Sequence, residues 1–195
     1  IHELLKRNEE RPAQERLPET VVRSFASKYK NILTKRSELE NLCNQDDVVT
    51  EIITYNPHLP DCILIDIDNT VAFSTSRGPY EWRRVEEDLP IIDMVELINN
   101  ISPDIVRIFL TGRSSDASEG TWKWLNKHFT FNDGGVSPVL IMRDSNDYRP
   151  AQVTKEELYN KYVKGNYNVL AAFDDDVRAI QMYRTKGLNV LLKKN

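Results

Sequence analysis

The chain has few cysteines and no long hydrophobic run. Its two cysteines among 195 residues are too few for a disulfide framework, so we expect a reducing, cytosolic setting. No run reaches membrane-spanning length and no signal peptide opens the chain, which predicts a protein without a membrane partner. The three histidines show no ligand spacing. The net charge of −4 argues against a broad nucleic-acid-coating surface, but not against a protein that grips a few phosphates.

The first part of the chain differs in character from the rest. Residues 1–58 are charge-rich, and an apolar stripe at Val21, Val22, Phe25 and Tyr29 has helical spacing. The sequence NPHLPD that follows is typical of a turn at a boundary. We therefore expect a helical segment over 1–58 and a separate domain over 59–195.

Beyond this boundary, apolar runs alternate with helical patterns. Strands are predicted at 62–67, 105–110, 138–142, 168–173 and 188–192, and helices at 90–99, 117–128, 151–163 and 176–186. Such alternation is typical of a parallel sheet with helices on both faces, a Rossmann-like α/β fold. In such sheets ligands bind at the carboxyl ends of the strands.

Within the helix expected over 117–128, two tryptophans compete for the core. Trp122 aligns with Leu125 and Phe129 at helical spacing, so we expect it to be buried and Trp124 to be partly exposed. Base stacking by Trp124 is an alternative to plain exposure.

Polar residues of related chemistry fall at the predicted strand ends. The first strand ends in DIDNT, the second in LTGR and the fourth in FDDD, and a lysine lies near the start of a helix. Together they bring to one edge Asp66, Asp68, Thr111, Lys155, Asp174 and Asp175. Clustered carboxylates repel one another unless a cation intervenes, and Mg²⁺ takes oxygen ligands of this kind. A threonine hydroxyl and a lysine ammonium suit a bound phosphate.

Each motif taken alone has a structural explanation. DIDNT is compatible with a strand-to-turn transition, TGR with an ordinary loop, and Lys155 with a solvated helix start. The acidic triplet is compatible with a helix N-cap, a role we expect beside metal binding. Only their order along the chain, each motif in its place beside a predicted strand or helix, favours chemistry.

In this order, DIDNT, TGR, Lys155 and DD resemble the four motifs of the haloacid dehalogenase phosphatase superfamily. More closely, TSRGPYEW and VTKEELYNKYV resemble the 3′-phosphatase domain of phage polynucleotide kinase-phosphatases. LLKRNEERPAQERLPETVVRSF resembles the lid region of the 5′-kinase domain, in which Arg7 and Arg11 are lid residues, yet the kinase phosphate loop G-x-x-x-x-G-K-[ST] is missing. The resemblance therefore implies the carboxyl-terminal part of a bifunctional 5′-kinase/3′-phosphatase.

The resemblance also implies roles for individual residues. Asp66 matches the nucleophile, which forms an aspartyl-phosphate, and Asp68 matches the general acid. The residues implied in substrate binding are Thr70, Arg77, Thr111, Gly112, Arg113 and Lys155. Those implied in Mg²⁺ binding are Asp66, Asp68 through its backbone carbonyl, Asp174 and Asp175, with Asp175 preferred over Asp174 as the direct ligand.

Two positions depart from the family pattern. Asn69 stands where phage members commonly have glycine, and asparagine tolerates the tight turn expected there. Asp176 stands where a basic residue is expected after the acidic pair, which weakens the local attraction for a substrate.

The predicted function is a Mg²⁺-dependent phosphatase acting on 3′-phosphorylated RNA or DNA ends in nucleic-acid repair. A small-molecule phosphatase of the same superfamily, acting on nucleotides or sugar phosphates, is the alternative. A partner-binding scaffold is disfavoured, since a binding module has no need of the two costly acids Asp66 and Asp68. The resemblance further implies homo-oligomers formed through the full-length enzyme and, for a phage protein, the cytoplasm of the bacterial host.

Overall fold

The chain divides into two compact units, Ile1–Asp46 and Asp47–Asn195. A computed structural model describes residues 53–74, 77, 81–131 and 135–192, together with the helical residues Glu9, Glu19 and Arg23. The apolar stripe, the lid-like segment with Arg7 and Arg11, and most of the expected segment 1–58 lie outside the described residues. The following description concerns the second unit.

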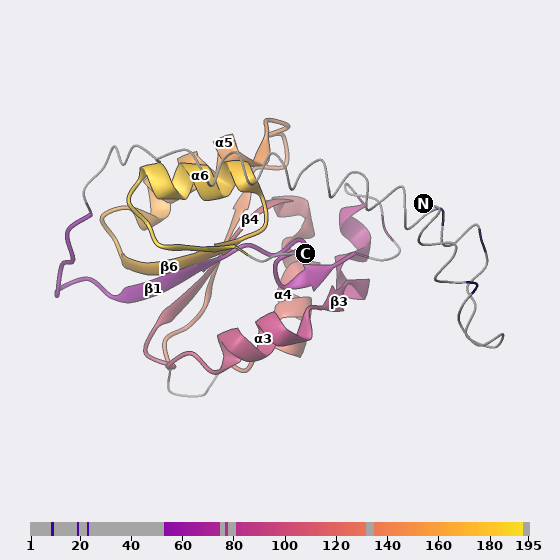
Figure 1. Cartoon of the computed structure of the whole chain (residues 1–195), viewed down its shortest axis with the longest axis horizontal. Coiled ribbons are helices and arrows are strands. Elements are labelled where there is room, and N and C mark those ends of the chain that lie inside the picture. Colours follow the sequence, from indigo (N-terminus) through magenta and orange to yellow (C-terminus); the bar gives the residue numbers. More distant parts are fainter. Residues whose placement is uncertain are drawn as a thin grey trace. The chain divides into compact units, whose positions relative to one another are not determined.

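A five-stranded parallel sheet forms the centre of this unit (Figure 1). The strand order is β5-β4-β1-β6-β7, with β1 and its neighbours β4 and β6 in the middle. The strands span Asp61–Ile65 (β1), Val106–Ser114 (β4), Val139–Arg143 (β5), Asn168–Asp174 (β6) and Val190–Leu192 (β7). All five predicted strands are therefore confirmed, and a buried parallel sheet explains why their sequences read as continuous apolar runs.

Helices cover both faces of the sheet (Figure 1). One face is packed by α5 and α6 and the other by α3 and α4. Their bounds are Ile92–Asn99 (α3), Ser118–His128 (α4), Ala151–Leu158 (α5), which continues as the π-helical turn η4 (Tyr159–Val163), and Val177–Thr185 (α6). The Rossmann-like arrangement expected from the sequence is thus confirmed.

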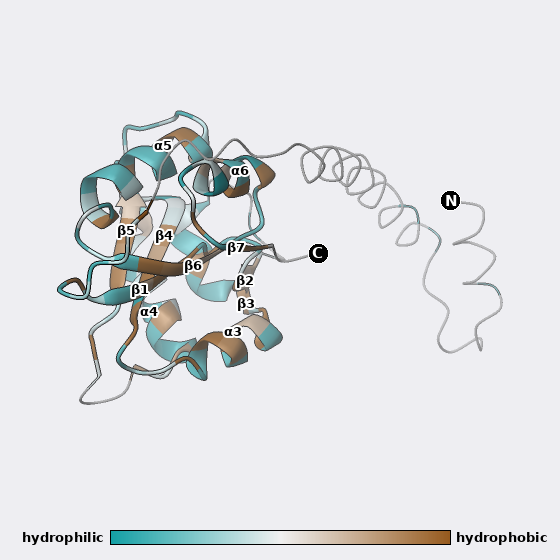
Figure 2. Ribbon diagram, turned by 60° about the vertical axis from the view of Figure 1, so that its left-hand side comes forward, coloured by the Kyte–Doolittle hydropathy of each residue, from teal (hydrophilic) through white to brown (hydrophobic). Residues whose placement is uncertain are grey.

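Alternate residues of β1 supply the two halves of the core. Cys62 and Leu64 face the core beneath α5 and α6, whereas Ile63 and Ile65 face the core above α3 and α4. The period of two along a strand produces this division. In Figure 2 the hydrophobic colour accordingly lies along the strands of the sheet, whereas the helices carry both colours. Among the described residues, no helix has both the length and the apolar character needed to span a bilayer.

A small hairpin between β1 and α3 was not predicted. Strand β2 (Ala72–Phe73) pairs antiparallel with β3 (Leu89–Pro90), and the 3₁₀-helix η2 (Trp82–Glu87) lies between them. A second 3₁₀-turn, η3 (Ser115–Ala117), precedes α4. The prediction that Pro90 opens a helix is wrong, because Pro90 pairs with Ala72 and α3 begins two residues later.

The prediction for the two tryptophans is also wrong. Trp124 is 1% exposed, and its indole N–H donates to the carbonyl oxygen of Asp88 at 2.7 Å, whereas Trp122 is only partly buried. The prediction treated Phe129 as helical, but Phe129 is the extended residue that ends α4. Helical spacing therefore does not relate it to Trp122. Burial of Trp124 also excludes the base-stacking alternative.

Candidate active site

The sheet brings Asp66 and Asp174 side by side. Asp66 follows the last residue of β1, and its backbone N–H donates to the carbonyl oxygen of Phe173 in β6 at 2.9 Å. Asp174 is the last residue of β6. Lys155 of α5 reaches both acids, with its Nζ 2.8 Å from Asp66 Oδ1 and 2.8 Å from Asp174 Oδ2. All three side chains are buried. One ammonium group therefore stabilises two carboxylates that would be costly to bury alone.

The charges in this cluster shift each other's titration. Burial raises the pKa of Asp66 well above its usual value, Asp174, Asp175 and Asp68 add to the rise, and Lys155 opposes it. Burial alone would lower the pKa of Lys155, but Asp66 and Asp174 outweigh it and hold that pKa well above its usual value. Lys155 thus stays an ammonium, whereas burial and the neighbouring acids favour the neutral form of Asp66.

Asp66, Asp174 and Asp175 are placed to share a cation. Each offers a carboxylate oxygen, and these oxygens lie within 4.8 Å of one another. Asp175 is partly exposed. Hard oxygen donors of this kind suit Mg²⁺, which binds through a few carboxylates and keeps several waters. The donor set therefore fits a divalent cation, whose charge would favour the ionised form of the buried acids.

The third acid of the triplet has a different role. Asp176 is the N-cap of α6, and its side chain accepts a hydrogen bond from the backbone N–H of Arg178 at 3.0 Å. The N-cap role expected for the triplet thus belongs to Asp176, since Asp174 is buried in the cluster with Lys155.

Asp68 lies in a second cluster, made of two acids and two arginines. Arg113 Nε and Nη2 each lie 2.9 Å from an oxygen of Asp68, and Arg77 Nη2 lies 2.8 Å from Oδ1. The same arginines bind Asp88, through two bonds from Arg77 and one from Arg113, each of 2.7 Å. Side-chain exposure is 2% for Arg77 and 0% for Arg113, against 37% for Asp68. The two arginine side chains, which are themselves buried, therefore hold the partly exposed Asp68 in place.

The same arginines control the charge of Asp68. Burial would raise the pKa of its carboxyl group, but Arg113 and Arg77 outweigh that effect and hold the pKa below its usual value. Asp68 is thus an anion in the free protein.

The turn after β1 fixes the spacing of the two acids. The Ile67 carbonyl accepts from the N–H groups of Val71 and Ala72, at 3.0 and 2.9 Å. Asn69 has a positive φ of 60°, a conformation that asparagine tolerates better than most residues. The expectation that asparagine suits this turn is confirmed. Thr70 is fully buried and donates its hydroxyl to Asp66 Oδ2 at 3.3 Å.

The TGR motif lies near the end of β4 and faces the start of α5. The Thr111 hydroxyl oxygen accepts from the backbone N–H of Arg113 at 3.2 Å, in a fully buried position. A side chain at Gly112 would place its Cβ 3.1 Å from the Cβ of Ala151, the first residue of α5. Glycine thus allows α5 to approach β4 closely, and Lys155 lies one helical turn further along α5.

Several residues of this edge were not assigned from the sequence. Asp88 holds both buried arginines. Trp82 has Arg77 and Arg143 over its ring, with guanidinium carbons 5.8 and 5.9 Å from the ring centroid. Arg143 ends β5, is 9% exposed, and its Nε has no hydrogen-bond partner among the described residues. The position of Arg143 at a predicted strand end was a usable signal, whereas Asp88 carried none.

A comparison with known protein families shows to which family the chain belongs. Residues 60–194 match the family described as the polynucleotide kinase PNKP phosphatase domain. The chain belongs to this family. The resemblance to the haloacid dehalogenase phosphatases and to polynucleotide kinase-phosphatases is thereby confirmed, and the second unit is a phosphatase domain.

Individual relatives point the same way. A protein of Autographa californica nuclear polyhedrosis virus, whose assigned name is bifunctional polynucleotide kinase/RNA ligase, is 33% identical over 128 residues, or 64% of this chain and 18% of that protein. A chain from the Pnkp1/Rnl/Hen1 RNA repair complex shows 25% identity and a TM-score of 0.66, covering 76% of this chain and 47% of the other. A second structure of that complex has a TM-score of 0.65 at the same identity, covering 76% and 50%. This chain therefore spans at most half of each relative.

Replacing Asp88 tests the buried cluster. Asp88→Asn leaves two buried guanidinium groups with less than their full charge compensation, so we expect a loss of about 3–5 kcal/mol in the free energy of unfolding. Urea unfolding followed by circular dichroism measures it. The control Asp93→Asn changes an exposed acid in the first turn of α3, and should cost less than about 1 kcal/mol. Equal losses in the two variants would show that Asp88 does not hold the cluster together.

Proposed function

We propose that this phosphatase domain removes the 3′-phosphate from RNA or DNA ends through an aspartyl-phosphate on Asp66. The observation that supports it most is the pair of 2.8 Å contacts that hold Asp66 beside Lys155 at the sheet edge. The family match adds the substrate class, since the relatives are named for polynucleotide kinase and RNA repair. We further propose that the full-length enzyme also phosphorylates 5′ ends, forms homo-oligomers and works in the cytoplasm.

The proposed reaction has two steps. In the first, Asp68 takes up a proton from solvent as the substrate phosphate binds. An Asp66 oxygen then bonds to phosphorus, the bond from phosphorus to the sugar O3′ breaks, and Asp68 gives its proton to O3′. In the second, a water attacks the same phosphorus, its proton passes to Asp68, and phosphate leaves Asp66. Lys155 and the Thr70 hydroxyl bind different oxygens of Asp66, which orients the nucleophile for both steps.

The contacts with the two arginines suit Asp68 to transfer a proton in both steps. Arg77 and Arg113 fix its position, and an arriving phosphate dianion raises the proton affinity of a nearby carboxylate. These contacts favour a positioning role for both arginines over the direct phosphate contact expected from the sequence. Thr111, Gly112 and Lys155 remain our candidates for holding the transferring phosphoryl group.

A Mg²⁺ ion would be held by Asp66, Asp174 and Asp175, together with the backbone carbonyl of Asp68. When bound, it would neutralise charge on the phosphoryl oxygens as a Lewis acid. Asp175, partly exposed beside two buried acids, is the candidate for the ligand with the largest share in recruiting the ion.

A comparison of three substrates tests the proposed function. We expect kcat/KM to be at least about tenfold higher for a 3′-phosphorylated oligonucleotide than for a nucleoside 3′-monophosphate, because extended contacts favour the polymer. We expect no reaction at a 5′-phosphate. Asp66→Asn should abolish phosphate release, whereas Asp176→Asn, which keeps an N-cap side chain, should not. A preference for the free nucleotide would instead identify a small-molecule phosphatase, and turnover by Asp66→Asn would exclude it as nucleophile.

Thermal unfolding tests the metal site without relying on activity. Mg²⁺ at 100 times its Kd should stabilise the wild type by about 2.7 kcal/mol. Asp175→Asn should lose most of this stabilisation while unfolding at a higher temperature without metal, because one repelling charge is gone. Asp176→Asn is the matched control and should respond as the wild type does. An unchanged Mg²⁺ response in Asp175→Asn, or full activity of the wild type in excess chelator, would contradict the assignment.

A further inference from the structure

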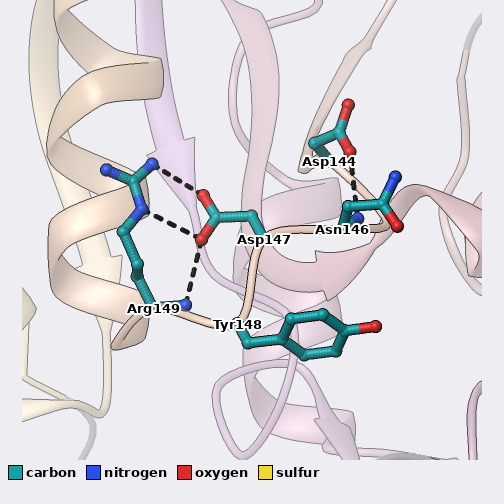
Figure 3. Close-up of a pocket in the computed structure, with 5 residues that line it drawn as sticks. All are labelled: Asp144, Asn146, Asp147, Tyr148 and Arg149. Carbon is teal, nitrogen blue, oxygen red and sulfur yellow. Dashed lines mark hydrogen bonds and ion pairs between the residues drawn. The ribbon is translucent and has the colours of Figure 1, made fainter.

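The loop between β5 and α5 presents an exposed aromatic ring at the edge of the sheet that holds the active site. Tyr148 is 85% exposed, the highest value among the exposed large hydrophobic side chains of the described residues. It lines an open pocket of about 570 Å³ together with Asp144, Asn146, Asp147 and Arg149. Figure 3 shows its ring directed away from the Asp147–Arg149 pair. Such exposure keeps the ring available as a contact surface.

The conformation of the loop is set by bonds that do not involve the tyrosine ring. Asp144 accepts from the backbone N–H groups of Asn146 and Asp147, at 3.0 and 3.1 Å. Arg149 pairs with Asp147 at 2.7 Å and with Glu157 of α5 at 2.6 Å. These contacts anchor the loop to α5 and hold the ring outward, so little ordering is needed for a flat partner to bind.

The loop is joined to both halves of the active site. Its far end leads into α5, which carries Lys155. Its near end is Arg143, whose guanidinium shares the Trp82 ring with Arg77, and Arg77 binds Asp68. Tyr148 therefore lies at the same edge of the sheet as Asp66, where the phosphoryl group of a substrate would bind.

The charge of the loop favours a base over a phosphate as its partner. Three acids, Asp144, Asp147 and Glu157, lie on this loop and on α5 against two cations, Arg143 and Arg149, and Arg149 is already paired with Asp147 and Glu157. A phosphodiester would be repelled there, whereas an uncharged base can stack on an aromatic ring whatever its identity.

We propose that Tyr148 stacks on a base of one of the last two nucleotides of an unpaired 3′ end. This inference rests on the proposed function and names the form of its substrate. A base within a duplex is already stacked and paired, so it would have to leave its helix to reach the ring. Tyr148 thus favours single-stranded ends.

Substitution at Tyr148 tests the proposal directly. On a single-stranded 3′-phosphorylated oligonucleotide, Tyr148→Ala should raise KM about 5- to 150-fold, as expected for one lost stack, with kcat nearly unchanged. Tyr148→Trp and Tyr148→Phe should keep a low KM because they keep the ring. Activity on p-nitrophenyl phosphate should not change in any variant. The control Tyr55→Ala removes another exposed tyrosine, 59% exposed and preceding β1 at the opposite edge of the sheet.

Substrates without one base provide the second arm. Removing the base from the terminal or the penultimate nucleotide should raise the wild-type KM as Tyr148→Ala does, and at the stacking position the two losses should not add. An unchanged KM in Tyr148→Ala, or fully additive losses at both positions, would overturn the stacking inference alone if the wild type still prefers oligonucleotides. A wild type that prefers free nucleotides would overturn the proposed function and the stacking inference with it.

Discussion

The contacts of Lys155 with Asp66 and Asp174 are the constraint on which the rest of the domain depends. Two carboxylates buried at neighbouring strand ends are strongly unfavourable without a cation. Lys155 reaches them because α5 lies close against β4, and glycine at position 112 favours that close approach. The helix layer, the strand register and the reactive acid are thus parts of one arrangement.

Asp68 depends on a different part of the fold. Its two arginines are held by Asp88, whose backbone carbonyl in turn accepts the indole N–H of Trp124 from α4. The β2–β3 hairpin places this residue near the turn after β1. Asp68, which is only partly exposed, is therefore tied to the hydrophobic core through Arg77, Arg113, Asp88 and Trp124, and this gives it a fixed position.

The sequence predicted the strands well because buried parallel strands read as apolar runs, and the acids at their ends then had to meet at one edge. The prediction from the sequence failed where no repeating spacing of apolar residues marks a strand or a helix. Strands of two residues, such as Ala72–Phe73, leave no alternation to detect. Asp88 and Arg143 act through partners in other loops, and no local pattern marks such contacts. Trp124 was misplaced because α4 ends before Phe129, and helix ends are hard to locate from periodicity alone.

The most direct test of the account is to identify the residue that carries phosphorus during turnover. With p-nitrophenyl phosphate, whose leaving group needs no proton, Asp68→Asn should still pass the first step but be slow in the second, which depends on activating water, so that a phosphorylated enzyme accumulates. Acid quenching, proteolysis and mass spectrometry would locate the phosphoryl group. We expect one phosphoryl group, on Asp66. Its appearance on any other residue, or phosphate release with no phosphorylated enzyme at any time in the reaction, would contradict it.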